Sequence, residues 1–199
     1  MWFPPKIAAV EHSGNINETR IRTNCCRMHK LVRDYAPPPA DIIVFTDGAC
    51  IHNGKPGARG AYAAVWPNYM HLNFGLLLPP TEKQTNNRAE LRAVLAAIER
   101  TDQVIDPNRA RPIVVHTDSM LIVNTVTKWM PGWKKNGWRK GRTGEAVANV
   151  DLLKILDLWL SYRKIAFRFV RAHTGRQDYD STYNNIVDQI ARSTLRGKK

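Results

Sequence analysis

The sequence predicts an α/β fold built on a mixed five-stranded sheet, and three observations support this prediction. Two apolar, β-branched runs, residues 42–45 and 113–115, each lead into a Thr-Asp pair. Three further strand-like stretches occur at residues 60–66, 71–78 and 166–170. Between and after them lie segments whose apolar residues follow the 3.6-residue period of a helix. We therefore expect three antiparallel strands and then two parallel ones, flanked by helices.

The first forty residues differ from the rest of the chain. They mix Pro, Asn, Thr and scattered charges without sustained periodicity, and they end in the stiff run Ala-Pro-Pro-Pro-Ala. We expect residues 1–40 to be a poorly ordered N-terminal extension with a Pro-rich linker, and residues 41–199 to be the folded, catalytic domain.

The charge of the chain predicts an anionic partner. The 199 residues carry a formal net charge of +13, which is more than solubility alone requires. No long apolar run or basic amphipathic helix is present, so nucleic acid is favoured over a membrane as the partner.

Three cysteines indicate a reducing compartment. The count is odd and two of the cysteines are adjacent, Cys25 and Cys26, which makes a poor disulfide framework. We expect an intracellular protein, in the nucleus or the cytoplasm. The arginines of residues 1–30 leave a mitochondrial destination open, and no secretory signal is present.

The first half of the domain reads as a meander followed by a helix. Residues 42–78 contain three apolar stretches separated by a Gly-rich turn at 53–57 and a Pro-Asn turn at 67–68, which predicts three antiparallel strands. Asn86 is a suitable N-cap for the helix that follows. The apolar stripe of that helix is Leu91, Val94, Leu95 and Ile98.

The second half alternates strands and helices. The fourth strand leads to Asp118 and a short helix through residues 120–126. An amphipathic helix is predicted over residues 149–162, and its inward positions are Leu152, Leu153, Leu156 and Trp159 or Leu160. The fifth strand follows at 166–170. The last helix is expected over residues 185–195.

Two aspartates lie where neighbouring strands would end. Asp47 and Asp118 each follow a threonine after a buried strand. If these strands are parallel neighbours, both carboxylates meet beyond the carboxyl edge of the sheet, where open α/β sheets bind ligands. Crowded oxygen ligands of like charge favour a hard cation such as Mg²⁺. The alternative is that each aspartate only caps the next element.

Three more residues could join this pair. Glu90 lies beside the apolar stripe of the first helix, where its alternative role is a favourable interaction with the helix dipole. Asp188 lies between apolar positions of the last helix, a costly place for an unpaired charge, so we predict a fourth ligand there. His173 follows the fifth strand and could transfer a proton. A surface histidine without a task fits its position equally well.

Residues 129–142 form a basic, aromatic segment that we call the basic projection. It contains three tryptophans, five cations and no acid, a mixture suited to a nucleic-acid backbone and its bases. The alternative is a solvated basic loop whose tryptophans are partly core. The candidate binding residues are Trp129, Trp133, Lys134, Lys135, Trp138, Arg139 and Lys140.

Taken together, these motifs resemble the catalytic domain of type 1, cellular ribonuclease H over about residues 41–196. The matching segments are Thr46-Asp47-Gly48, Gln84-Thr85-Asn86-Asn87-Arg88-Ala89-Glu90, Thr117-Asp118-Ser119, Gly132-Trp133-Lys134-Lys135-Asn136-Gly137-Trp138, and Val170-Arg171-Ala172-His173 before Asp188. We expect a eukaryotic, fungal-like member with the ribonuclease H-like fold.

The resemblance implies a function and a role for individual residues. It implies a monomeric endonuclease that cuts the RNA strand of RNA/DNA hybrids, using two Mg²⁺ ions that Mn²⁺ can replace, and that leaves 5′-phosphate and 3′-hydroxyl ends. The implied metal ligands are Asp47, Glu90, Asp118 and Asp188, with His173 assisting proton transfer. The residues implied to face RNA sugars are Asn53, Asn86 and Asn87, those implied to hold a DNA phosphate are Lys83, Thr85 and Asn149, and those implied to line a DNA channel are Trp129 and Trp133.

The chain also departs from the family pattern. The segment between His173 and the last helix is longer than the family's compact loop and keeps only Asn184 in register. We therefore expect a mobile loop there and a less firmly held histidine. Two alternatives remain open: the ribonuclease H domain of a retroelement reverse transcriptase, and an inert hybrid-binding protein.

Overall fold

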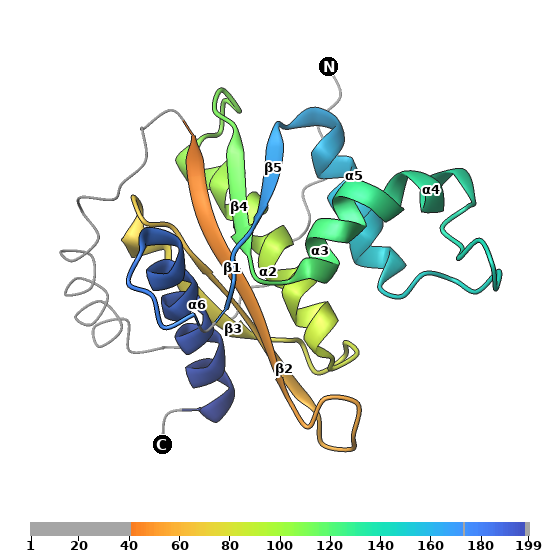
Figure 1. The fold of residues 1–199 in the computed structure, drawn as a ribbon, viewed down its shortest axis with the longest axis horizontal. Helices are drawn as coiled ribbons and strands as arrows, with labels where there is room; N and C mark the ends of the chain where they lie inside the picture. The colour runs from red at the N-terminus through yellow and green to blue at the C-terminus, as the bar shows by residue number, and fades with distance from the viewer. Residues whose placement is uncertain (1–40, 173, 198–199) are drawn as a thin grey trace.

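The computed structural model describes residues 41–172 and 174–197 and contains the predicted mixed sheet (Figure 1). The strand order is β3-β2-β1-β4-β5. The pairs β1–β2 and β2–β3 are antiparallel, while β1–β4 and β4–β5 are parallel, so the predicted topology is confirmed. The strands are β1 (Ile42–Ile51), β2 (Arg59–Val65), β3 (Phe74–Leu77), β4 (Ile113–Thr117) and β5 (Ile165–Phe169). The predicted N-terminal extension, residues 1–40, and His173 lie outside the described residues.

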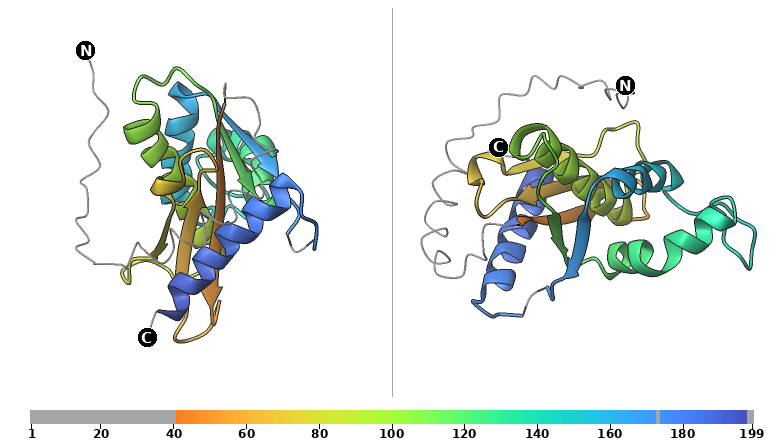
Figure 2. Two further views of the ribbon diagram at one scale, coloured as in Figure 1. Left: turned by 90° about the vertical axis from the view of Figure 1, so that its left-hand side faces the viewer. Right: turned by 90° about the horizontal axis from the view of Figure 1, so that it is seen from above.

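Helices cover both faces of the sheet, as the two views of Figure 2 show. On one face, α2 (Asn86–Arg100) and α5 (Val150–Tyr162) enclose the larger apolar core with side chains such as Val44 and Val115. On the other face, α6 (Tyr179–Arg196) packs against Phe45 and its neighbours on β2. The sheet is thus a central layer between two helical layers.

Helix α2 begins one residue earlier than predicted, because its N-cap is not Asn86 but the residue before it. Its N-cap is Thr85, whose hydroxyl accepts a hydrogen bond from the backbone N–H of Arg88 at 3.4 Å, and Asn86 is the first helical residue. Threonine is, like asparagine, a residue type that satisfies an unpaired N–H at a helix start. The predicted stripe is confirmed, since Leu91, Val94, Leu95 and Ile98 are all buried.

Helix α6 begins at Tyr179, six residues before the predicted start. The side chain of Asp178 caps it by accepting a hydrogen bond from the backbone N–H of Ser181 at 2.9 Å. Tyr183 is buried against the sheet in this added turn and a half. The expectation of a long irregular loop up to Asn185 was therefore wrong, because polar residues at 180–185 hid an amphipathic turn.

The helical path after β4 is irregular. It runs through α3 (Met120–Asn124), a π-helical turn (Thr125–Trp129) and α4 (Met130–Lys135). In Figure 1, α4 and the loop after it extend away from the sheet. No helix among the described residues combines the length and the apolarity that a membrane crossing requires.

The end of the sheet opposite the site is held by a buried ion network. The guanidinium of Arg163, which precedes β5, lies 2.8 Å from a carboxylate oxygen of Asp102 and 2.8 Å from one of Asp106. Asp102 lies in the π-helical turn (Thr101–Ile105) that follows α2, and Asp106 comes directly after this turn. Arg109 also pairs with Asp102 at 2.8 Å, and the backbone N–H groups of Ala110 and Arg111 donate to Asp106, so Arg163 completes a shared network that fixes the start of β5 against the segment after α2.

Candidate metal and nucleic-acid site

The two predicted aspartates meet where β1 and β4 part. The parallel pairing of these strands ends at Phe45 and His116, and each chain continues by two residues to Asp47 and Asp118. Contrary to expectation, Asp47 is not at the end of its strand, because β1 continues to Ile51 in antiparallel pairing with β2. The longer strand holds the Asp47 backbone in the sheet, which makes its position rigid.

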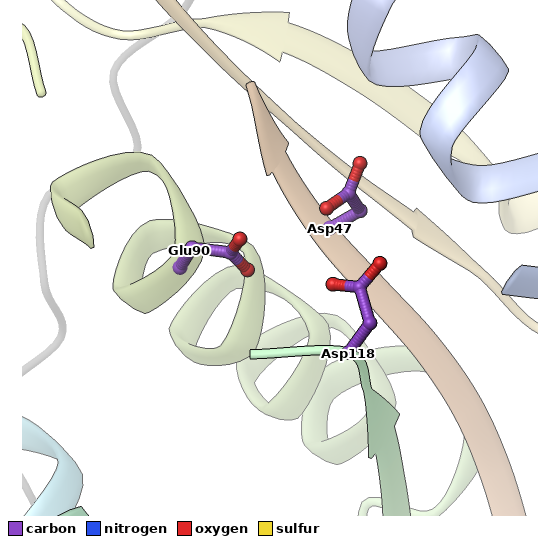
Figure 3. Close-up of side chains that lie close together, drawn as sticks. All are labelled: Asp47, Glu90 and Asp118. Atoms are coloured by element: carbon purple, nitrogen blue, oxygen red, sulfur yellow. The ribbon is translucent and has the colours of Figure 1, made fainter. Parts of the chain in front are cut away.

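Helix α2 brings a third carboxylate to this place. Oxygen atoms of Asp47, Glu90 and Asp118 all lie within 4.8 Å of one another. Figure 3 shows the three side chains converging from the middle of β1, the first turns of α2 and the segment after β4. They line one open pocket of about 440 Å³, which Asp188 and Arg192 of α6 also line.

A close approach of backbones positions Glu90. A Cβ atom placed on Gly48 would lie 2.3 Å from the backbone nitrogen of Glu90 and 2.5 Å from the carbonyl carbon of Ala89. Only a residue without a side chain lets α2 lie this close to β1. The glycine of the Thr-Asp-Gly motif therefore brings Glu90 within reach of Asp47.

The carboxylates repel one another strongly. Burial, and then the nearby charges of Asp118 and Asp188, raise the pKa of Asp47 to about 8, and the positive charge of Arg192 opposes this shift. Burial, and then Asp47 and Asp118, raise the pKa of Glu90 well above its ordinary value. A bound cation would reduce the repulsion between the ionised carboxylates and so favour their charged form.

The donor set fits a divalent metal. Glu90 is 5% exposed, and its Oε2 atom is buried without a hydrogen-bond partner among the described residues. Its other oxygen, Oε1, accepts a hydrogen bond from the side-chain amide of Asn86 at 3.4 Å. A buried oxygen left open beside two other carboxylates is a ligand atom of the hard kind that Mg²⁺ prefers.

Two asparagines orient the carboxylates. Asn86 holds Glu90 as described, and the amide of Asn184 donates to Oδ2 of Asp118 at 3.1 Å. Asn184 is 2% exposed and lies on the part of α6 that was not predicted as helix. In the sequence, Asn184 was noted as the residue that stays in register with the family pattern, but no orienting role was assigned to it.

Asp188 lines the pocket but does not belong to the group of three. Its Oδ1 atom lies 2.6 Å from Nε of Arg192, one turn along α6. The ion pair with Arg192 thus offsets the cost of placing the Asp188 charge between apolar positions. The apolar pattern around Asp188 did not indicate this partner. His173 lies outside the described residues, so its role stays a prediction.

The residues expected to hold the nucleic acid gather around the start of α2. The backbone N–H of Asn86 donates to Oδ1 of Asn53 at 3.2 Å. Arg88 donates to Oδ1 of Asn149 at 3.3 Å and pairs with the Asp151 carboxylate at 2.7 Å. The first bond brings Asn53 to Asn86, and the second joins Asn149 to Arg88, whose backbone N–H is bound to the cap residue Thr85. The remaining two candidates, Lys83 and Asn87, lie on the same connection into α2 and in its first turn.

Asn149 has a left-handed backbone, with φ of 56°. Asparagine tolerates this conformation better than most residues. Because Oδ1 is occupied by Arg88, the amide NH₂ of Asn149 remains as the donor of this side chain. A donor in that place suits an anionic ligand.

In the basic projection, tryptophan side chains pack against the core, and some of the cations are exposed and have no ion pair within the described residues. Trp133 and Trp138 pack in part against the main core, while Trp129 is 40% exposed with its ring 5.8 Å from that of Trp133. The alternative that the tryptophans are partly core therefore holds for Trp133 and Trp138, while binding of nucleic acid by the tryptophans stays a prediction. Lys134 is bound to Asp157 of α5 at 2.7 Å.

Other cations of the projection are bound within its own loop. Lys140 pairs with Glu145 at 3.0 Å, and Arg139 donates to the carbonyl of Gly144 at 2.8 Å. Lys135 and Arg142 are exposed and have no ion pair within the described part of the chain. These two cations are the ones most available to an anionic partner.

Comparisons with known proteins identify relatives of this chain. A family model described as RNase H matches residues 39–196. Ribonuclease H1 of Mus musculus is 37% identical over 151 residues, which cover 76% of this chain and 49% of the mouse protein. Ribonuclease H of a Cyanothece strain is 33% identical over 156 residues, which cover 78% of this chain and 90% of the bacterial protein. The chain thus spans about half the length of the mammalian relatives it matches.

Solved structures share the fold at lower identity. LC9-RNase H1, a type 1 RNase H with the type 2 active-site motif, aligns with a TM-score of 0.60 at 23% identity, covering 82% of this chain and 76% of that one. The PFV RNase H domain aligns with a TM-score of 0.62 at 19% identity, covering 77% of this chain and 93% of that one. Mouse and bacterial relatives match about equally well, so a eukaryotic origin is not confirmed. The family match spans the whole folded domain, and the chain belongs to the RNase H family.

Proposed function

We propose that this chain is an endoribonuclease that hydrolyses the RNA strand of RNA/DNA hybrids. The observation that carries the proposal is the convergence of Asp47, Glu90 and Asp118 within 4.8 Å. Membership of the RNase H family supports it, as do relatives named Ribonuclease H at 33–37% identity. We propose two Mg²⁺ ions as cofactors, with Mn²⁺ as a substitute, a monomeric protein and an intracellular location.

The residues of the chain would share the work as follows. The metal ligands would be Asp47, Glu90, Asp118 and Asp188. Bound divalent ions would lower the pKa of an attacking water and stabilise the leaving 3′-oxygen, which leaves 5′-phosphate and 3′-hydroxyl ends. Asn86 and Asn184 hold two of the carboxylates in a fixed orientation, which reduces the reorganisation needed during the reaction.

Recognition of the duplex would use the polar and basic surroundings. Distinguishing RNA from DNA requires contact with the 2′-hydroxyl, and we assign this to Asn53, Asn86 and Asn87 at the start of α2. We assign a DNA phosphate to Lys83, Thr85 and Asn149, and the DNA strand beyond it to Trp129, Trp133 and the cations of the basic projection.

A cleavage assay tests the proposal. A 5′-labelled RNA strand would be offered as a hybrid, as single-stranded RNA and as double-stranded RNA, in Mg²⁺ and in EDTA. We expect cleavage of the hybrid alone and only with Mg²⁺. Tight binding of the hybrid without cleavage would instead support the alternative of an inert hybrid-binding protein. The presence of all four acids argues against this alternative. The retroelement alternative is not favoured, because proteins named Ribonuclease H, HI and H1 are 33–37% identical to this chain.

The carboxylates and the histidine should differ in their effects. Asp188→Asn removes a proposed ligand, so we expect it to lower the single-turnover rate far more than His173→Ala does. A group that only assists proton transfer contributes at most about 10²–10⁴, and we expect a loss of at least several-fold with measurable Mg²⁺-dependent activity left. Complete loss in His173→Ala, or no loss in Asp188→Asn, would contradict this division of roles.

The basic projection should contribute to affinity through its free cations. We expect Lys135→Gln with Arg142→Gln to weaken hybrid binding and to reduce the slope of log affinity against log salt by about 0.7–0.9 for each phosphate that is no longer neutralised. Lys134→Gln with Lys140→Gln should change the slope less, because each lysine is already paired with a carboxylate. Equal slopes for both double variants, measured by fluorescence anisotropy, would refute this assignment.

A further inference from the structure

Arg192 is a cation that lines the acidic pocket and pairs with one of its acids. Its Nε atom lies 2.6 Å from Oδ1 of Asp188, and both residues line the pocket with Asp47, Glu90 and Asp118. The side chain of Arg192 is 53% exposed while that of Asp188 is 18% exposed. The ion pair therefore has its acidic partner inside the pocket and its basic partner at the rim.

This pair limits what Asp188 can do. The hydrogen bond from the Arg192 guanidinium occupies one acceptor site on Oδ1 of Asp188, and it fixes the orientation of that carboxylate. The other three acids form a compact group from which Asp188 is absent in the described structure. To join the group as a fourth ligand, the Asp188 carboxylate must turn toward the other three acids, and this movement competes with its hydrogen bond to Arg192.

We propose that Arg192 is a positioning residue that competes with the metal for Asp188. It holds the Asp188 carboxylate in the metal-free protein and releases it when a divalent cation occupies the pocket. Arg192 thus lowers the affinity for the cation and sets the concentration at which the site fills. This inference rests on the metal site of the proposed function.

A second arginine provides a matched control. Arg196 lies one turn further along α6, lines the same pocket and is exposed. It has no ion pair within the described residues. Its removal changes the charge of the pocket by the same amount without touching Asp188, so it measures the general electrostatic effect alone.

The experiment is a calorimetric titration of the full chain with Mg²⁺, and with Mn²⁺, at neutral pH. We expect Arg192→Gln to bind the cation about two- to fivefold more tightly than wild type, the effect of releasing one partly exposed ion pair. Arg196→Gln should tighten binding less. Arg192→Lys keeps a charge at this position and should lie between wild type and Arg192→Gln. Thermal unfolding in EDTA should be nearly unchanged in all three variants.

A double-mutant cycle separates competition from general charge. In an Asp188→Asn background, Arg192→Gln should tighten binding no more than Arg196→Gln does, because the ligand for which Arg192 competes is gone and only the general charge effect remains. Equal tightening in both backgrounds, or equal effects of Arg192→Gln and Arg196→Gln in the wild-type background, would overturn the proposal. A wild-type protein that binds neither ion would instead refute the metal site of the proposed function itself.

Discussion

Asp47→Asn is expected to abolish cleavage of the hybrid and, without metal, to stabilise the fold. Asparagine keeps the shape of the side chain but removes one charge from a repulsive group, so the proposed metal site loses a ligand while the apo protein is relieved of a repulsion. Single-turnover cleavage in Mg²⁺ measures the first effect. Near wild-type hydrolysis by this variant would show that the metal site is wrongly assigned.

The pH dependence of stability measures the second effect. The pKa of Asp47 is about 8 in the folded chain against 3.8 for a free aspartate. Between these values the folded state holds a proton that the unfolded state has lost, so this group destabilises the fold progressively as the pH rises toward 8. Urea unfolding in EDTA from about pH 5 to pH 9 should show a fall in wild type that is smaller in Asp47→Asn. Asp41→Asn, at the other end of the β1 segment, should keep both the fall and the cleavage.

Gly48→Ala adds a single methyl group and should greatly reduce both the stability of the fold and the activity. Its Cβ would lie 2.3 Å from the backbone of Glu90, so α2 itself must move away from β1. Overpacking of a core typically costs about 1–3 kcal/mol, and a clash with backbone should lie at the upper end. The same movement withdraws Glu90, so we expect loss of Mg²⁺ binding and of cleavage as well.

Gly60→Ala is the matched control for this prediction. Gly60 lies on β2 opposite Cys50, and its Cβ would meet the Cδ1 atom of Leu78 at 2.5 Å. The end of a leucine side chain can rotate away, which a helix backbone cannot. Denaturant unfolding and Mg²⁺ titration should therefore show a smaller loss of stability and an intact site. Equal losses of stability and of Mg²⁺ binding in the two variants would show that the backbone contact at Gly48 is no more restrictive than the side-chain contact at Gly60.

The sheet and the acidic group were predictable because each depends on local patterns. The two Thr-Asp endings follow β-branched runs, and the topology rule for parallel neighbours places them together. The stripe on α2 gave the face of the helix and hence the side from which Glu90 approaches. These features follow from the periodic spacing of apolar residues, which can be read from the sequence and which indicates the buried face.

The rest depends on partners that are distant in sequence. The start of α6 was hidden because Asn184 and Ser181 are polar, and their burial is understood only when Asp118 and Thr174 are seen beside them. The pair of Asp188 with Arg192 is the exception, since these residues are only four positions apart and their spacing on a helix would have indicated an ion pair. The cations of the basic projection were read as equivalent, since nothing in the sequence shows that an acid of α5 neutralises Lys134.

The acidic pocket draws on all three layers of the fold, with Asp47 from the sheet, Glu90 from α2 and Asp188 from α6. These groups come together only after both helical layers have docked on the sheet, so a cation that binds them recognises the native state alone. Its binding free energy then becomes folding free energy, about 2.7 kcal/mol at a metal concentration 100 times Kd. A protein deprived of metal loses this contribution and keeps the repulsion. Metal supply would in this way govern the folded fraction of the chain as well as its activity.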